Sequence, residues 1–244
     1  MRGKIPARSP LPPISPTARR PLRRRAGVPR LHLQPRKMKT LKIGLTGGMG
    51  CGKSAAGAIF RELGIEVLDA DALARRALSE NPQVRAALSE IFGGCAFLPD
   101  GSPNRPEIAR MAFSDRKKLA ALEAAVHPAV REAWTRRAGE IQNASGGGFT
   151  ALAVEIPLLF EKGLEKNFDI CITVFCSEAT RLDRLRKRGM GPKEIGARDA
   201  FQLPPLEKVR LASVALFNEG NLDFLRRQAA LTLFNLKDRW TKTP

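Results

Sequence analysis

The glycine-rich segment at residues 47–54 carries residue types that bind a nucleoside triphosphate. It matches the pattern G-x-x-x-x-G-K-[ST] at every position and ends in Lys53 and Ser54. Glycines let the backbone adopt positive φ and bring its N–H groups against phosphate oxygens. The lysine is expected to reach the β- and γ-phosphates, and the serine hydroxyl to ligate Mg²⁺. The predicted triphosphate contacts of this segment are Gly47, Gly48, Met49, Gly50, Cys51, Gly52, Lys53, Ser54 and Ala55.

The residues on either side supply the strand and the helix that such a loop needs. Residues 41–46 are a short apolar run typical of a strand, and residues 55–63 are predicted to be helical. The loop would then lie at a helix N-terminus, where partial positive charge favours an anion. In the empty loop we expect Lys53 to face solvent. A tight glycine turn without a ligand is the alternative interpretation.

Two acidic residues follow the second predicted strand, at residues 65–68. They are Asp69 and Asp71. Ligands of open α/β sheets bind outside the carboxyl ends of the strands. Asp71 is therefore a candidate to accept a proton from an attacking hydroxyl or to organise the water around Mg²⁺. Capping the next helix is the alternative role of Asp71.

Apolar runs and amphipathic segments alternate after residue 38, which predicts an α/β fold with a mostly parallel sheet between helices. Further strands are expected at 149–155, 169–175 and 214–217. The predicted helices are 71–79, 82–92, 106–113, 115–140, 178–188, 192–202 and 222–236, and 93–105 is a predicted loop. About 80 residues separate the second and third strands, far more than one crossover helix needs. We expect a second substrate to bind there.

Residues 1–37 differ from the rest of the chain in composition. They hold 11 lysines and arginines, eight prolines and no acidic residue. Such a segment cannot build a core and is predicted to be disordered. Three explanations stay open: an organelle-targeting peptide, a basic tail that binds anions, or a stretch that is not translated because Met38 is the true start. We favour the third.

The composition of the rest of the chain favours a cytoplasmic enzyme that acts on small molecules. The net charge of +18 becomes +7 once residues 1–37 are left out, and no basic stripe precedes residues 181–188, so we expect no nucleic-acid partner. No apolar run approaches the ~18 residues of a membrane span. The four cysteines lack metal-binding spacing, which predicts reduced, buried or half-buried thiols. No obligate protein partner is expected.

Several further motifs lie in a characteristic order. They are His127-Pro128, the run Ile156-Pro157-Leu158-Leu159-Phe160-Glu161, and the spaced residues Ala197, Arg198, Gln202, Lys208 and Asn218. Together with the phosphate loop and the Asp-Ala-Asp step at 69–71, they resemble the dephospho-coenzyme A kinase family over residues 40 to about 235. The resemblance implies a P-loop NTPase fold with a helical acceptor-binding insert at about 72–145 and a small helical lid at about 181–203. It also implies ATP-dependent phosphorylation of the ribose 3′-hydroxyl of dephospho-CoA, the last step of coenzyme A synthesis.

The resemblance also implies catalytic roles. Lys53, Arg184 and Arg188 would neutralise charge on the transferred phosphoryl group, together with Mg²⁺ on Ser54. Asp71 would face the acceptor hydroxyl as base or orienter. A solvated helix face is the alternative for the arginines, since three arginines at i, i+2 and i+4 do not all face one ligand.

The implied binding residues lie farther along the chain. His127 and Leu158 would line the acceptor pocket, and Arg198 and Asn218 would contact ATP, with Asn218 at the adenine. A packing histidine before a proline kink is the alternative for His127, and a turn residue is the alternative for Asn218. The chain departs from the family pattern at Cys51, at Ala55 and at residues 212–214.

Two other classes of function stay in view. A P-loop ATPase or GTPase switch would hydrolyse its nucleotide to control a partner, but no guanine-reading Asn-Lys-x-Asp motif occurs, because residues 166–169 do not fit it. A nucleic-acid-binding module would depend on residues 1–37. Removal of those residues would separate that module from a kinase.

Overall fold

One five-stranded sheet organises residues 39–242, the part of the chain that this computed structural model describes. The strands are β1 (Leu41–Gly47), β2 (Glu66–Asp69), β3 (Ala151–Glu155), β4 (Ile170–Phe175) and β5 (Val214–Phe217). Every strand pair is parallel, and the order across the sheet is β2-β3-β1-β4-β5. The predicted α/β class is therefore confirmed, whereas the predicted disorder of residues 1–37 concerns a segment outside the described residues.

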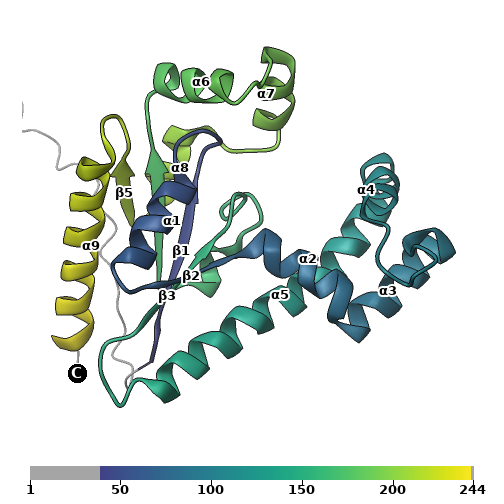
Figure 1. The fold of residues 1–244 in the computed structure, drawn as a ribbon, viewed down its shortest axis with the longest axis horizontal. Coiled ribbons are helices and arrows are strands. Elements are labelled where there is room, and N and C mark those ends of the chain that lie inside the picture. Colours follow the sequence, from purple (N-terminus) through teal and green to yellow (C-terminus); the bar gives the residue numbers. More distant parts are fainter. Residues whose placement is uncertain (1–38, 243–244) are drawn as a thin grey trace, which may run out of the picture. The chain divides into compact units, whose positions relative to one another are not determined.

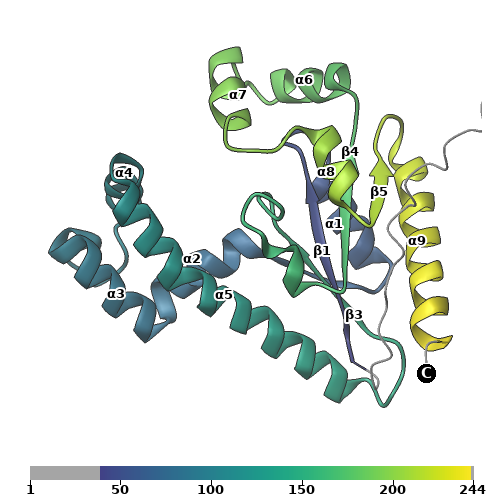
Figure 2. The same ribbon diagram turned by 180° about the vertical axis from the view of Figure 1, so that it is seen from behind.

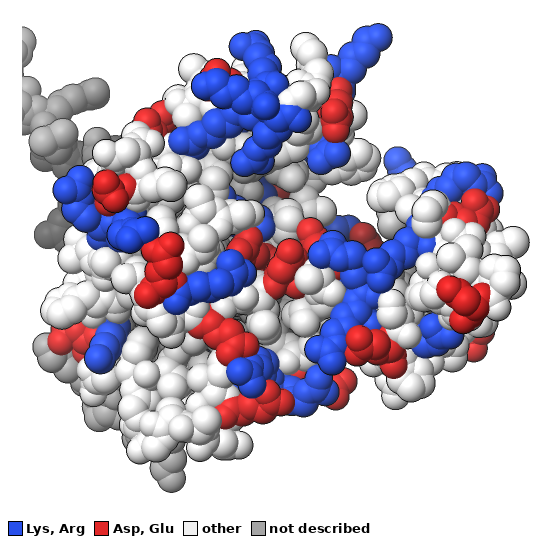
Figure 3. Space-filling view, viewed as in Figure 1, with Lys and Arg blue, Asp and Glu red and all other residues white. Residues whose placement is uncertain are grey.

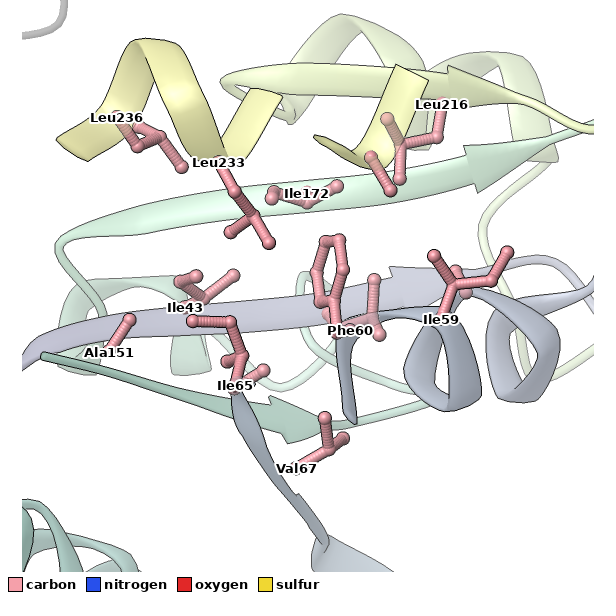
Figure 4. Close-up of a cluster of buried hydrophobic side chains, with 14 of the residues drawn as sticks. Ile43, Ile59, Phe60, Ile65, Val67, Ala151, Ile172, Leu216, Leu233 and Leu236 are labelled. Atoms are coloured by element: carbon pink, nitrogen blue, oxygen red, sulfur yellow. The ribbon is translucent and has the colours of Figure 1, made fainter. Parts of the chain in front are cut away.

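Helices cover both faces of the sheet, as Figures 1 and 2 show from opposite sides. α1 (Lys53–Glu62) and α9 (Leu222–Lys242) pack on one face, and Figure 4 shows the buried apolar side chains between them and the strands. α5 (Arg116–Ala144) packs on the other face with the residues that follow β3. In β3, Ala153 joins the first core and Val154 the second, because successive strand residues point to opposite faces.

Four helical segments precede α5 in the connection from β2 to β3. They are α2 (Ala70–Glu80), α3 (Pro82–Phe92), the 3-10 helix η1 (Gly93–Ala96) and α4 (Arg105–Ser114). A side-chain oxygen caps each of the four α-helices of this connection; the caps are Asp69, Asn81, Asn104 and Asp115. The predicted loop at 93–105 is thus partly ordered, since it contains η1 and a short antiparallel bridge from Phe97 to Pro103. Pro128 lies inside α5, which continues through it to Ala144.

Three short helices follow β4. They are α6 (Glu178–Lys187), α7 (Pro192–Asp199) and α8 (Pro205–Leu211). α6 and α7 lie beyond the carboxyl ends of the strands in Figure 1, where the predicted lid belongs. α8 was not predicted, because seven residues are too few to show a helical period, although proline at its first position favours a helix start.

The helices and the cysteines of the structure test two expectations, that no segment spans a membrane and that the thiols are reduced and buried or half-buried. Within residues 39–242, no helix combines the length and apolar character that crossing a bilayer requires. All four cysteines are free, and three are buried. Cys95 is exposed, so the prediction of burial is wrong for that thiol, which lies in the insert away from both sheet cores.

Candidate active site

The phosphate loop joins the end of β1 to the start of α1. Gly50 has φ +82° and Gly52 has φ +99°, which are left-handed conformations that only glycine adopts without strain. Gly52 directly precedes α1, and no side chain caps this helix. The unpaired N–H groups of its first turn therefore remain available to an anion at the loop.

Lys53 does not face solvent, contrary to the expectation from the sequence. Its Nζ lies 2.7 Å from Oε2 of Glu155, and its side chain is only 18% exposed. Glu155 ends β3 and is buried, and Arg61 approaches its other oxygen at 3.6 Å. The physical reason is that a buried carboxylate needs a cation, and Lys53 is the nearer of its two cationic neighbours.

A cavity of about 820 Å³ opens in front of the loop. Its walls come from the phosphate loop, the start of α2, α5, the segment after β3 and the predicted lid. The predicted site residues that line it are Gly47, Gly48, Met49, Gly50, Gly52, Lys53, Ser54, Ala55, Asp71, His127, Leu158, Arg188 and Arg198. The structure therefore brings most of the predicted site to one cavity, whereas Cys51, Arg184 and Asn218 do not line it.

Asp71 lies in the first turn of α2 and lines this cavity. The cap of α2 is Asp69, which accepts hydrogen bonds from the backbone N–H groups of Asp71 at 2.8 Å and Ala72 at 3.2 Å. The capping alternative for Asp71 is therefore excluded. Partial burial, and next the charge of Asp69, raise the pKa of the Asp71 carboxyl above 3.8, although Lys53 and Arg75 act in the opposite direction.

α5 contributes a polar and an apolar part of the wall. His127 and Arg131 lie one turn apart and both line the cavity, and His127 is exposed, which argues against a packing role. Arg131 was missed by the sequence analysis, although its i+4 spacing from His127 is a usable signal. Val126 and Trp134 form the apolar part of this wall. The buried Nε1–H of Trp134 has no acceptor among the described residues.

One buried arginine holds together the helices of the predicted lid. Arg181 in α6 forms two hydrogen bonds with each of two carboxylates, those of Glu178 and Asp199, at 2.7 to 2.9 Å. Arg181 thereby ties α6 to α7 and is not free for a ligand. Arg188 and Arg198 are exposed, and Figure 3 shows the basic side chains that gather over this part of the molecule.

Arg184, Asn218 and Cys51 lie together beside the phosphate loop. Asn218 is buried and donates from Nδ2 to the carbonyl of Cys51 at 2.9 Å, and Arg184 donates to the carbonyl of Asn218 at 2.9 Å. Arg184 Nη1 and Asn218 Oδ1 are buried without a partner among the described residues. Asn218 is therefore more than a turn residue. Arg188 lines the cavity and Arg184 does not, although residues four apart share a face within a helix, because α6 ends at Lys187 and Arg188 is its C-cap.

Two further residues of the site were missed. Glu155 gave only a weak signal, as the one acid at the end of an apolar strand. Gln202 accepts a hydrogen bond at its Oε1 from the Met49 N–H at 3.3 Å and so links the segment after α7 to the phosphate loop. That contact spans 153 residues of sequence, and no local pattern predicts it.

A parallel sheet with a phosphate loop at its central strand, facing a large cavity, defines a P-loop NTPase. A family model for dephospho-CoA kinase matches residues 41–223. The chain therefore belongs to the dephospho-CoA kinase family, as the sequence motifs indicated.

Individual relatives agree with this assignment. A dephospho-CoA kinase from Deinococcus radiodurans is 39% identical over 197 residues, which are 80% of this chain and 92% of that protein. The dephospho-CoA kinase from Corynebacterium efficiens is 36% identical over 190 residues, 78% of this chain and 94% of that one. A protein of Thermus thermophilus with a crystal structure is 35% identical, with a TM-score of 0.69 over 81% of this chain and 98% of that chain.

Proposed function

We propose that this protein transfers the γ-phosphoryl group of ATP to the ribose 3′-hydroxyl of dephospho-CoA, giving coenzyme A and ADP. The observation that carries the proposal is the single cavity shared by the phosphate loop, Asp71 and the α5 wall. One cavity allows a triphosphate and a long acceptor to meet with the reacting atoms in line, which is the main requirement of phosphoryl transfer.

The phosphate loop would hold ATP by its backbone N–H groups. Lys53 would leave Glu155 for the β- and γ-phosphates, since a triphosphate offers more negative charge than one carboxylate. Glu155 would keep Arg61 as a neighbour, 3.6 Å away. The charge that the phosphates bring is thereby matched without leaving the buried carboxylate isolated.

Magnesium fits the chemistry of two oxygen-bearing residues of the cavity. Ser54 and Asp71 both line it, and hydroxyl and carboxylate oxygens are the donors that Mg²⁺ takes alongside water and phosphate. Among residues 39–242, no cluster of three His, Cys, Asp or Glu side chains forms a separate metal site. Bound Mg²⁺ would neutralise charge on the transferred phosphoryl oxygens.

Asp71 would accept the proton of the acceptor hydroxyl or orient that hydroxyl towards the γ-phosphorus. Its raised pKa brings the carboxylate closer to the range of an effective general base. His127 and Arg131, which both line the cavity, would bind the diphosphate of dephospho-CoA. Leu158, Val126 and Trp134 would contact the neutral arm of the acceptor.

The lid would complete the charge around the transferred group. Arg188 and Arg198 line the cavity and would approach the phosphates when the lid closes, which also removes water from the reaction. Arg184 and Asn218 would lie at the nucleotide base side, next to Gly52. A cytoplasmic location, small-molecule substrates and the absence of nucleic-acid or protein partners accompany this proposal.

Coupled ADP release tests the proposal directly. We expect turnover with ATP and dephospho-CoA, and little turnover when nucleoside monophosphates replace the acceptor. ATP hydrolysis at the same rate without any acceptor would favour a P-loop switch protein instead.

A chain that begins at Met38 tests the basic extension. We expect it to keep full activity, since every proposed site residue lies after residue 38. Loss of activity on truncation, together with indifference to Arg188→Ala, would contradict the lid assignment and favour a role for the basic tail.

A further inference from the structure

A lysine that solvent does not reach connects α8 to the wall of the cavity. Lys208 has 0% exposure. Its Nζ donates to the carbonyl oxygen of Pro157 at 2.6 Å and lies 2.8 Å from Oε1 of Glu161. Pro157 and Leu158 line the cavity. The buried ammonium therefore fixes the backbone of the wall that the acceptor would contact.

Glu161 extends the connection to the end of the lid. Its Oε1 also accepts a hydrogen bond from the backbone N–H of Leu203 at 2.8 Å, and its Oε2 is buried without a partner among the described residues. Leu203 directly follows Gln202, whose side chain accepts from the Met49 N–H. Residues 200–206, which lead from the predicted lid to α8, form the lid's return segment. Glu161 holds this segment at Leu203, and the phosphate loop holds it at Gln202.

The carbonyl of Pro157 is also held from β1. Thr46 is buried, precedes Gly47 and donates from Oγ1 to this carbonyl at 3.2 Å. One backbone oxygen therefore has a donor from the strand that carries the phosphate loop and another from α8. Its place sets the spacing between the loop and the wall at Leu158.

We propose that Lys208 and Glu161 are positioning residues, which hold the Pro157 wall and the lid's return segment in register with the phosphate loop so that the acceptor hydroxyl meets the γ-phosphoryl group. This inference rests on the proposed function. Well-packed apolar residues can replace a buried ion pair without loss of stability. The pair instead fixes the position of two backbone groups: the Pro157 carbonyl in the cavity wall, and the Leu203 N–H next to Gln202.

Lys208→Met removes the donor to Pro157 and leaves Glu161 uncompensated. A misplacement of about 1 Å can cost about 100-fold in rate, so we expect kcat/KM for dephospho-CoA to fall by about that factor. The Kd of ATP, measured by calorimetry, should stay close to the original value. Arg137→Met is the control: it breaks an exposed pair with Glu66 and should change neither quantity.

The double variant Lys208→Met with Glu161→Gln separates positioning from stability. It contains no buried charge at this place, and the amide oxygen that the second substitution introduces can still accept from the Leu203 N–H. We expect the urea midpoint to recover relative to Lys208→Met, while kcat/KM for dephospho-CoA stays low because the Pro157 carbonyl still lacks its donor. Recovery of kcat/KM together with the midpoint would show a structural role only and overturn the proposal, as would an equal loss of ATP binding.

Acceptor kinetics of a Thr46 variant and hydrogen exchange of Lys208→Met test the same proposal in two further ways. Thr46→Val retains both charges and should raise KM for dephospho-CoA without changing ATP binding; if neither Lys208 variant folds, normal acceptor kinetics in Thr46→Val overturns the proposal. Hydrogen exchange without substrates should be faster at residues 156–164 and 200–206 in Lys208→Met. Absence of turnover in the unaltered protein would refute the proposed function, whereas unchanged exchange would refute the anchoring.

Discussion

Two lysine–glutamate pairs near the cavity have similar geometry and different surroundings. Lys53 lies 2.7 Å from Glu155, lines the cavity and is 18% exposed, whereas Lys208 lies 2.8 Å from Glu161 and is 0% exposed. An entering phosphate can offer Lys53 a second partner, but nothing from solvent reaches Lys208. Access of solvent and ligands, rather than the chemistry of the pair, therefore separates an ion pair that can exchange partners from one that cannot.

Removal of the exchangeable lysine should have the largest effect. Lys53→Met is expected to lower kcat by about 10³-fold, the scale of losing one charge-stabilising donor in a transition state. Coupled ADP release measures it. Arg137→Met, which removes an exposed cation paired with Glu66, is the control and should retain activity. Near-normal turnover of Lys53→Met would mean that Lys53 stays on Glu155 during the reaction.

Asp71→Asn tests whether phosphoryl transfer takes place beside the Lys53–Glu155 pair. We expect kcat to fall by about 10²-fold, within the usual contribution of a general base. The Kd of ATP should remain unchanged, because Asp71 would act on the acceptor. Steady-state kinetics and calorimetry measure the two quantities. An active variant that is only less stable would contradict the role, since Asp69 already caps α2.

The unfolding free energies of the two lysine variants sharpen the comparison. Lys208→Met should cost about 3–5 kcal/mol, because it leaves a buried charge without a partner. Lys53→Met should cost about 1–2 kcal/mol, since Arg61 remains near Glu155 and the cavity admits water. Urea unfolding of both proteins provides the values. Equal costs would show that the two pairs are equally fixed.

The smallest expected effect is a shift in the pH profile. Because its pKa is raised above 3.8, Asp71 should lose its base form as pH falls through that raised value, and kcat/KM should fall with it. Asp69→Ser keeps a side chain that can cap α2 and removes one charge that raises this pKa. The acidic limb of the profile should therefore move to lower pH. If the acidic limb does not move, a group other than Asp71 causes it.

The parallel sheet and the phosphate loop were predictable because their signals are local. Residues 47–54 carry the glycine pattern, and apolar runs marked every strand within a few residues of its observed bounds. The site was predictable in part: Asp71, His127 and Leu158 line the cavity, but their roles stay predictions. α8 was missed because its residues are too few to show a period.

Local patterns and motifs in a fixed order were enough to predict the strands, the longer helices, the phosphate loop and the family. Only the tertiary structure decided which charges meet. Glu155 is 102 residues from Lys53, and Gln202 is 153 residues from Met49. Such pairs form because folding buries a polar group whose nearest available partner comes from another element, and a pairing between distant residues leaves no local pattern in the sequence.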